Sequence, residues 1–204
     1  MNRKQMRIIM AAIGVLVSGL SVGLFKAAVF GTDPFQCFVN GVANKVPIGF
    51  GTLYMMINVI MLAFIFILEK KYIGLATFIN IFLLGYVTQF STYLLNMAFP
   101  EPGIVLRSVF LIFGIVILCF ASAMYFTADL GVSTYDALSL IMADKKIAKF
   151  KYCRIGCDLL CVLIGFLLHA VIGVGTLVTA FFMGPLIEFF REKVAQPLLD
   201  NYQD

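Results

Sequence analysis

The sequence predicts an all-α integral membrane protein with six transmembrane helices and two short re-entrant or interfacial helices. Of its 204 residues, 62% are hydrophobic and 13% are charged, and the mean hydropathy is +1.01. Soluble domains contain about 25% charged residues. Long apolar runs recur along the chain, and the second half of the chain repeats the first. These observations place the protein in a lipid bilayer.

The internal repeat has a shift of about one hundred residues. Aligned pairs include Gly31 with Gly131, Phe50 with Phe150, Asn58 with Asp158 and, after a one-residue deletion, Thr77 with Thr176. We predict a single membrane domain, residues 1–204, in which repeats 7–98 and 107–193 are joined by a hinge at 99–106. Each repeat has three spans and one short helix, so the second copy is inverted. Such repeats are typical of transporters with a substrate site at the repeat interface.

Six apolar stretches have about the 20 residues that a helix needs to cross a bilayer. The predicted spans run from Met6 to Phe30, Phe50 to Leu68, Tyr72 to Met97, Val105 to Thr127, Tyr152 to Ala170 and Thr176 to Phe190. The segment Pro100-Glu101-Pro102-Gly103 separates the third span from the fourth, because proline cannot continue a helix.

Two shorter segments, Pro34 to Val46 and Thr134 to Ala143, each follow the first span of a half. A hydrocarbon core about 30 Å thick is too thick for either segment at 1.5 Å per helical residue. Gly31 and Gly131 interrupt the chain just before these segments. We therefore expect two short helices that enter the membrane without crossing it.

The first turns of these short helices carry residues that cap helices. Asp33, Ser133 or Thr134 can accept hydrogen bonds from free backbone amides, and Pro34 suits a first helical turn. A helix N-terminus carries partial positive charge, so two such ends meeting near mid-membrane would attract an anion, a carbonyl oxygen or a zwitterion. The alternative is that both are ordinary capped turns at the membrane surface.

Basic residues concentrate at alternate ends of the predicted spans. The clusters are Arg3, Lys4 and Arg7; Lys70 and Lys71; Lys145, Lys146, Lys149, Lys151 and Arg154; and Arg191 and Lys193. Because Lys and Arg accumulate in short cytoplasmic connections, both termini are predicted to be cytoplasmic. The net charge of +4 is distributed beside the spans, so we expect no nucleic-acid partner.

Asn58 and Asp158 occupy equivalent positions, several residues inside their spans. A carboxylate at such depth is costly and marks a functional site by default. Asp158 can bind an amine or cation, or carry a coupled proton. Its alternative role is a structural ion pair with Arg154, one helical turn earlier.

The last span of each half carries a polar stripe, Thr77 and Asn80 in the first and Thr176 and Thr179 in the second. These residues can line a pathway, or they can bond their own backbone or a neighbouring helix. The full candidate substrate site comprises Asp158, Asn58, Thr32, Asp33, Pro34, Gln36, Ser133, Thr134, Asp136, Thr77, Asn80, Thr176 and Thr179.

Other polar and small residues in the spans are better explained by structural roles than by chemical ones. Lys26 either extends to the lipid headgroups or faces a solute. Gly19 and Gly23 allow close helix approach, at the repeat interface or in a homodimer. The cysteines at 153, 157 and 161 lie along one side of a helix and cannot converge on one ion, so we expect no metal and no other cofactor. The sequence contains no motif of an enzyme.

With these motifs in view, the chain resembles the bacterial YczE/YyaS/YitT group of small integral membrane proteins. The resemblance rests on Gly31-Thr32-Asp33-Pro34-Phe35-Gln36 and Gly131-Val132-Ser133-Thr134-Tyr135-Asp136, and on the glycine-threonine segments Gly74-Leu75-Ala76-Thr77 and Gly173-Val174-Gly175-Thr176. The family pattern is Gly-x-x-Pro, an aromatic residue and an acid. Here Gln36 replaces the acid in the first copy and Thr134 replaces the proline in the second, so Asp136 is the remaining acid. The resemblance implies a bacterial plasma membrane.

We predict a secondary transporter or facilitator of a small solute, coupled to a proton or a cation. A channel of related architecture is an alternative, because paired short helices can also frame a selectivity filter. A third alternative is a non-transporting subunit or assembly factor that acts with a partner complex, with the loop from Asp144 to Lys151 as its docking surface.

Overall fold

The computed structural model describes residues 2–201, apart from the side chains of residues 150 and 151, and this part of the chain contains helices and no strand. The helices in the first half are α1 (Arg3–Ala28), α2 (Pro34–Ala43), α3 (Phe50–Leu68), the 3₁₀ turn η1 (Lys70–Tyr72), α4 (Leu75–Ile79), the π turn η2 (Asn80–Leu84) and α5 (Gly85–Ala98). Those in the second half are α6 (Ile104–Ala128), α7 (Thr134–Asp144), α8 (Phe150–Leu167), α9 (Val174–Phe190), the π turn η3 (Arg191–Ala195) and α10 (Gln196–Asp200).

Five helices in the described residues are long and apolar enough to cross a membrane. They are α1, α3, the continuous helix α4–η2–α5, α6 and the continuous helix α9–η3–α10. The predicted last span ends at Phe190, where α9 ends, but the helix continues beyond it through η3 to Asp200. The sixth predicted span corresponds to α8, which is outside this group because Lys151, Arg154 and Asp158 lie within its 18 residues.

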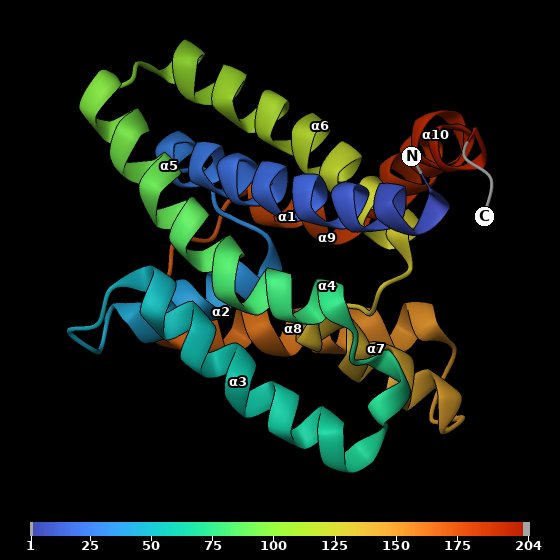
Figure 1. The fold of residues 1–204 in the computed structure, drawn as a ribbon. Coiled ribbons are helices and arrows are strands. Elements are labelled where there is room, and N and C mark those ends of the chain that lie inside the picture. The colour runs from blue at the N-terminus through green and yellow to red at the C-terminus, as the bar shows by residue number, and fades with distance from the viewer. Residues whose placement is uncertain (1, 202–204) are drawn as a thin grey trace.

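The helices form two layers (Figure 1). In one layer α1 and α6 lie side by side and run in opposite directions, with α5 against α1 and α9 against α6. The other layer contains α3 and α8, again in opposite directions, with α2 packed against α8 and α7 against both. The two short helices therefore lie between longer ones, which buries their first turns.

Small residues set the close packing of α1 against its neighbours. A Cβ atom on Gly19 would lie 2.8 Å from Val87, and one on Gly23 would collide with Ser91. Both neighbours belong to α5, so these glycines serve a contact within the first half. This corrects the expectation that they lie at a repeat interface or in a homodimer. At the contact between α1 and α6, the Ser21 hydroxyl donates a 2.6 Å hydrogen bond to the Gly114 carbonyl.

The basic clusters lie at one end of the helix bundle, where the N-terminus, η1, the α7–α8 connection and α10 come together (Figure 1). Ion pairs join these segments. Lys71 in η1 pairs with Asp144 at the end of α7, and Arg3 pairs with Asp200 at a distance of 3.7 Å. The turns at residues 44–49, 99–103 and 168–173 lie at the opposite end.

Candidate functional site

Each short helix begins after a left-handed glycine. Gly31 has a φ of 93° and Gly131 a φ of 101°, a region that residues with a Cβ atom rarely adopt. These glycines turn the chain from a long helix into a short one, as the sequence predicted. The break therefore depends on glycine in both halves.

Each break is held by the other half of the chain. The Gly175 amide donates a 2.8 Å hydrogen bond to the Phe30 carbonyl, and the Ala76 amide donates a 2.9 Å bond to the Leu130 carbonyl. These two bonds connect equivalent positions in reciprocal directions. A backbone carbonyl freed by a helix break needs a partner inside a membrane, and the start of each half's last span supplies it.

Thr77 and Thr176, two of the candidate substrate residues, lie at these joints. The Thr77 hydroxyl donates to the Val132 carbonyl at 2.7 Å and accepts from the Gly74 amide at 3.1 Å. Thr179 bonds the Thr176 carbonyl of its own helix at 3.0 Å. The geometry favours the structural alternative for Thr77 and Thr179, whereas the buried Thr176 hydroxyl has no hydrogen-bond partner in the described residues.

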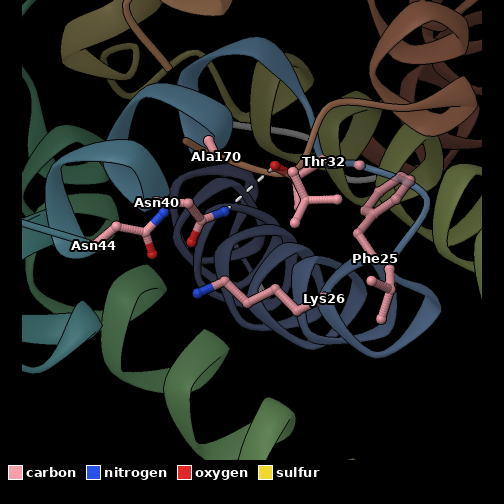
Figure 2. Close-up of a pocket in the computed structure, with 9 residues that line it drawn as sticks. Phe25, Lys26, Thr32, Asn40, Asn44 and Ala170 are labelled. Carbon is pink, nitrogen blue, oxygen red and sulfur yellow. Dashed lines mark hydrogen bonds between the residues drawn. The ribbon is translucent and has the colours of Figure 1, made fainter. Parts of the chain in front are cut away.

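The first turn of α2 is capped as expected. Asp33 accepts a 3.2 Å hydrogen bond from the Gln36 amide, and Pro34 occupies the first turn. Thr32 accepts a 3.4 Å bond from Asn40 (Figure 2). The Gln36 side chain is 4% exposed, and its amide oxygen has no hydrogen-bond partner in the described residues.

The first turn of α7 makes contact with the first half of the chain. Ser133 caps this helix by accepting a 3.1 Å bond from the Asp136 amide. The Thr134 hydroxyl donates a 2.5 Å bond to the side-chain oxygen of Asn58, which is fully buried in α3. The Asn58 amide nitrogen donates to the Tyr54 carbonyl at 2.8 Å.

The N-terminal turns of the two short helices meet. The rings of Phe35 in α2 and Tyr135 in α7 stack with centroids 4.9 Å apart. Tyr54 packs edge-on against Phe35 at 5.8 Å and donates a 3.2 Å hydrogen bond to Asn80. Asn80 is one of the predicted site residues, whereas these aromatic residues are not among them.

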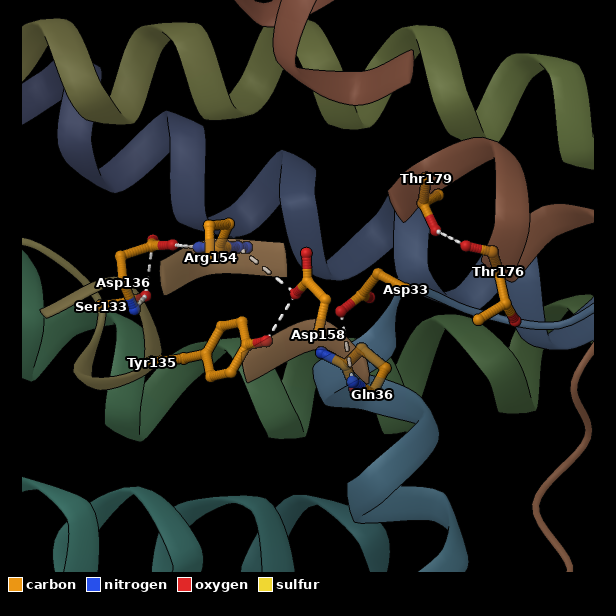
Figure 3. Close-up of polar contacts among 9 residues, drawn as sticks. All are labelled: Asp33, Gln36, Ser133, Tyr135, Asp136, Arg154, Asp158, Thr176 and Thr179. Atoms are coloured by element: carbon orange, nitrogen blue, oxygen red, sulfur yellow. Dashed lines mark hydrogen bonds and ion pairs between the residues drawn. The ribbon is translucent and has the colours of Figure 1, made fainter. Parts of the chain in front are cut away.

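A partly buried acid–base cluster lies beside this aromatic contact (Figure 3). Arg154 forms an ion pair with Asp136 and a longer one, 3.4 Å, with Asp158. The Tyr135 hydroxyl donates a 2.5 Å hydrogen bond to Asp158, and the guanidinium of Arg154 lies 4.6 Å from the centre of the Tyr135 ring. Asp33 lies close enough to interact electrostatically with both Arg154 and Asp158.

The cluster (Asp33, Asp136, Asp158, Arg154 and Tyr135) holds three carboxylates and one guanidinium. Asp158 is 8% exposed, so little water compensates its charge. A buried carboxylate is costly unless it is paired, protonated or bound to a cation. The arrangement can therefore hold a proton or a cation in addition to Arg154.

The structure brings most predicted site residues together and leaves some apart. Asn58, Asp136, Asp158 and the first turns of both short helices converge, whereas Thr176 and Thr179 lie away from the cluster (Figure 3). The ion pair between Arg154 and Asp158 follows from their i, i+4 spacing in the sequence. The second ion pair of Arg154, with Asp136, depends on the packing of α7 against α8.

Fold and contacts define a multi-pass helical integral membrane protein. Residues 5–192 match the family described as a family of unknown function, DUF6198, and the chain belongs to this family. An uncharacterized protein of Haemophilus influenzae is 25% identical over 95% of this chain and 86% of its own length. Two Bacillus subtilis proteins are similar: uncharacterized protein YyaS, 24% identical over 93% of this chain and 94% of its own, and uncharacterized membrane protein YczE, 22% identical over 94% and 86%.

The similarity to YyaS and YczE confirms the resemblance that the glycine motifs indicated. No solved structure matches the chain with statistical significance.

Proposed function

We propose that the protein is a secondary transporter or facilitator of a small polar solute in the bacterial plasma membrane. Its site lies where α2 and α7 meet, and the acid–base cluster supplies the groups that bind the solute or a coupled proton or cation. The observation that carries this proposal is the position of a charged, largely buried cluster at the contact of two short helices. Intramembrane ionisable groups of this kind mark substrate and ion pathways.

In this account the chain consists of two inverted repeats. The support is the same order of helices in each half, namely long, short, long and a last long helix that contains a π turn, with α1 opposite in direction to α6 and α3 to α8 (Figure 1). The reciprocal bonds of Gly175 to Phe30 and Ala76 to Leu130 follow the same symmetry. Alternating access would rock one half against the other about these joints.

We assign α8 as the sixth span. Its charged face, with Arg154 and Asp158, turns toward α2 and α7. Its other face is apolar and exposed: Leu159, Leu160 and Leu163 are 63%, 57% and 54% exposed, which suits contact with lipid. Six spans would place both termini on one side of the membrane, and the shared basic end of the bundle supports the cytoplasm as that side.

Ligand-dependent stability of the purified protein tests the site. Thermal unfolding would be followed against amino acids, organic acids, amines, vitamins and ions. A ligand at 100 times its Kd adds about 2.7 kcal/mol of stability. We expect at least one hit that Asp158→Asn loses and that Asp144→Asn, a matched change at an exposed carboxylate, retains.

A panel without a hit would count against a solute site and would favour a subunit of a larger complex, for which co-purification of a stoichiometric partner is the direct assay. For a hit, flux into vesicles separates the two transport classes. Saturation at low solute concentration indicates a carrier, and linear flux indicates a channel.

A further inference from the structure

A pocket of about 220 Å³ lies between α1 and α2, at the end of the bundle opposite the basic clusters. Its polar lining comes from Lys26, Thr32, Asn40 and Asn44, and Phe25 is among its apolar walls. Figure 2 shows Lys26 reaching toward the side of the pocket where Asn40 and Asn44 lie. This pocket is separate from the acid–base cluster, whose residues do not line it.

Lys26 is the one charged side chain in the pocket lining. Within the described residues it forms no ion pair, and its ammonium lies 3.1 Å from the centre of the Phe50 ring. The face of an aromatic ring attracts a cation but does not neutralise it. When Lys26 is protonated, the pocket therefore has a positive charge without a carboxylate partner.

The remaining polar groups in the pocket can donate hydrogen bonds. Thr32 accepts from Asn40 at 3.4 Å, which leaves its hydroxyl proton to bond a ligand. Asn40 has a second amide proton, whereas the Asn44 amide donates to the His169 carbonyl at 3.0 Å and to the Leu168 carbonyl at 3.4 Å. An ammonium with neighbouring hydroxyl and amide donors is the environment that an anionic oxygen group requires.

The fold does not require these residues at these positions. The equivalents of Lys26 and Thr32 in the second half are Phe126 and Val132, and the chain forms the same left-handed glycine break there. The glycine break therefore does not need Lys26 or Thr32, and ligand binding is a role that accounts for both residues.

We propose that the pocket between α1 and α2 binds an anionic oxygen group with Lys26 as its counter-charge. The volume is below the roughly 300–1,000 Å³ of pockets for drug-sized ligands, so the ligand is a small carboxylate or the phosphate of a lipid headgroup. Both present the same chemistry to Lys26. Binding at this pocket does not depend on transport through the cluster.

Isothermal titration in an uncharged detergent at neutral pH tests the proposal. The probes are acetate, lactate and succinate, with acetamide and lactamide as uncharged analogues of the first two. We expect at least one carboxylate to bind and its amide not to bind. Lys26→Met should weaken binding at least tenfold, and Lys45→Met, a change at an exposed lysine outside the pocket, should not.

Asn40→Asp provides a second variant in case Lys26→Met fails to fold. It preserves side-chain size and places a carboxylate in the same pocket, so it should weaken binding of the anion as well. Carboxylate binding that is unchanged in both variants would overturn the proposal. The proposal would also be overturned if Asp158→Asn abolishes carboxylate binding and Lys26→Met retains it. That result would place the carboxylate at the acid–base cluster.

A separate titration tests whether the ligand is the phosphate of a lipid headgroup. Phosphatidylglycerol is titrated into the same detergent sample when no carboxylate binds. Lys26-dependent binding of this lipid would support the anion site and assign the phosphate as its ligand. If neither the carboxylates nor phosphatidylglycerol binds in a Lys26-dependent way, the proposal is wrong.

Discussion

The Thr134 hydroxyl donates a 2.5 Å hydrogen bond to the side-chain oxygen of Asn58. Both side chains are fully buried, and they come from different halves of the chain. Thr134 opens α7, and Asn58 lies inside α3. The bond therefore fixes the first turn of one short helix against a long helix of the other half.

Thr134→Val should lower the free energy of unfolding by about 1–3 kcal/mol, because it leaves the buried Asn58 oxygen without a partner. Thermal or denaturant unfolding in detergent measures the change. Thr92→Val is the matched control, since the Thr92 hydroxyl bonds its own helix at the Thr88 carbonyl. Equal effects of the two substitutions would show that the Thr134–Asn58 bond does not stabilise the contact.

Gly131→Ala should destabilise the protein by at least about 1–2 kcal/mol, since alanine at positive φ is strained and its Cβ would lie 2.7 Å from the Thr77 hydroxyl oxygen. Gly156→Ala in α8 is the control. A Cβ there meets nothing within 4 Å, and alanine favours a helix over glycine by about 1 kcal/mol. If both variants lower the unfolding midpoint equally, or if Gly131→Ala does not lower it, the glycine break is not strained by a Cβ atom.

Local features of the sequence were sufficient to predict the helices. The bounds of α3, Phe50–Leu68, agree with the predicted span, and α2 and α7 begin at the predicted Pro34 and Thr134. Apolar runs, glycine breaks and capping residues act over a few residues along the chain. The helix beyond Phe190 was missed because its residues are too polar for a span.

Contacts between the halves could not be predicted from local patterns. The repeat alignment related Thr77 to Thr176, but it did not show that Thr77 bonds Val132 across the halves. Similarly, Tyr135 gave no local signal for its bond to Asp158. Such contacts depend on how helices pack, which a sequence period does not specify.

Arg154→Met should destabilise the protein by about 3 kcal/mol, because it leaves Asp136 and Asp158 without their shared cation. The side chain is 35% exposed, so we expect the lower end of the range for buried pairs. Arg154→Lys should have a smaller effect, since an ammonium keeps the charge but lacks the planar fork that reaches both carboxylates. A Met variant as stable as the wild type would show that the cluster does not need Arg154.

The Lys71–Asp144 pair predicts a pH dependence at the basic end. Hydrogen bonds from Lys71 and then Tyr72 lower the pKa of the Asp144 carboxyl below its ordinary 3.8. A lowered carboxyl pKa contributes stability above the unfolded-state value and loses it as pH falls through the folded value. The wild type should therefore exceed Asp144→Asn in unfolding temperature at neutral pH.

This advantage should disappear below pH 3.8. High salt should reduce it at neutral pH, since the pair is exposed and screened. A difference between the two proteins that does not change with pH would contradict the assignment.

Uptake into proteoliposomes tests the central claim most directly, with the ligand identified by thermal stabilisation as the labelled solute. The account predicts uptake that saturates with solute concentration, is lost in Asp158→Asn and is retained in Asp144→Asn. Uptake no greater than in protein-free liposomes, for a ligand that the purified protein binds, would contradict it.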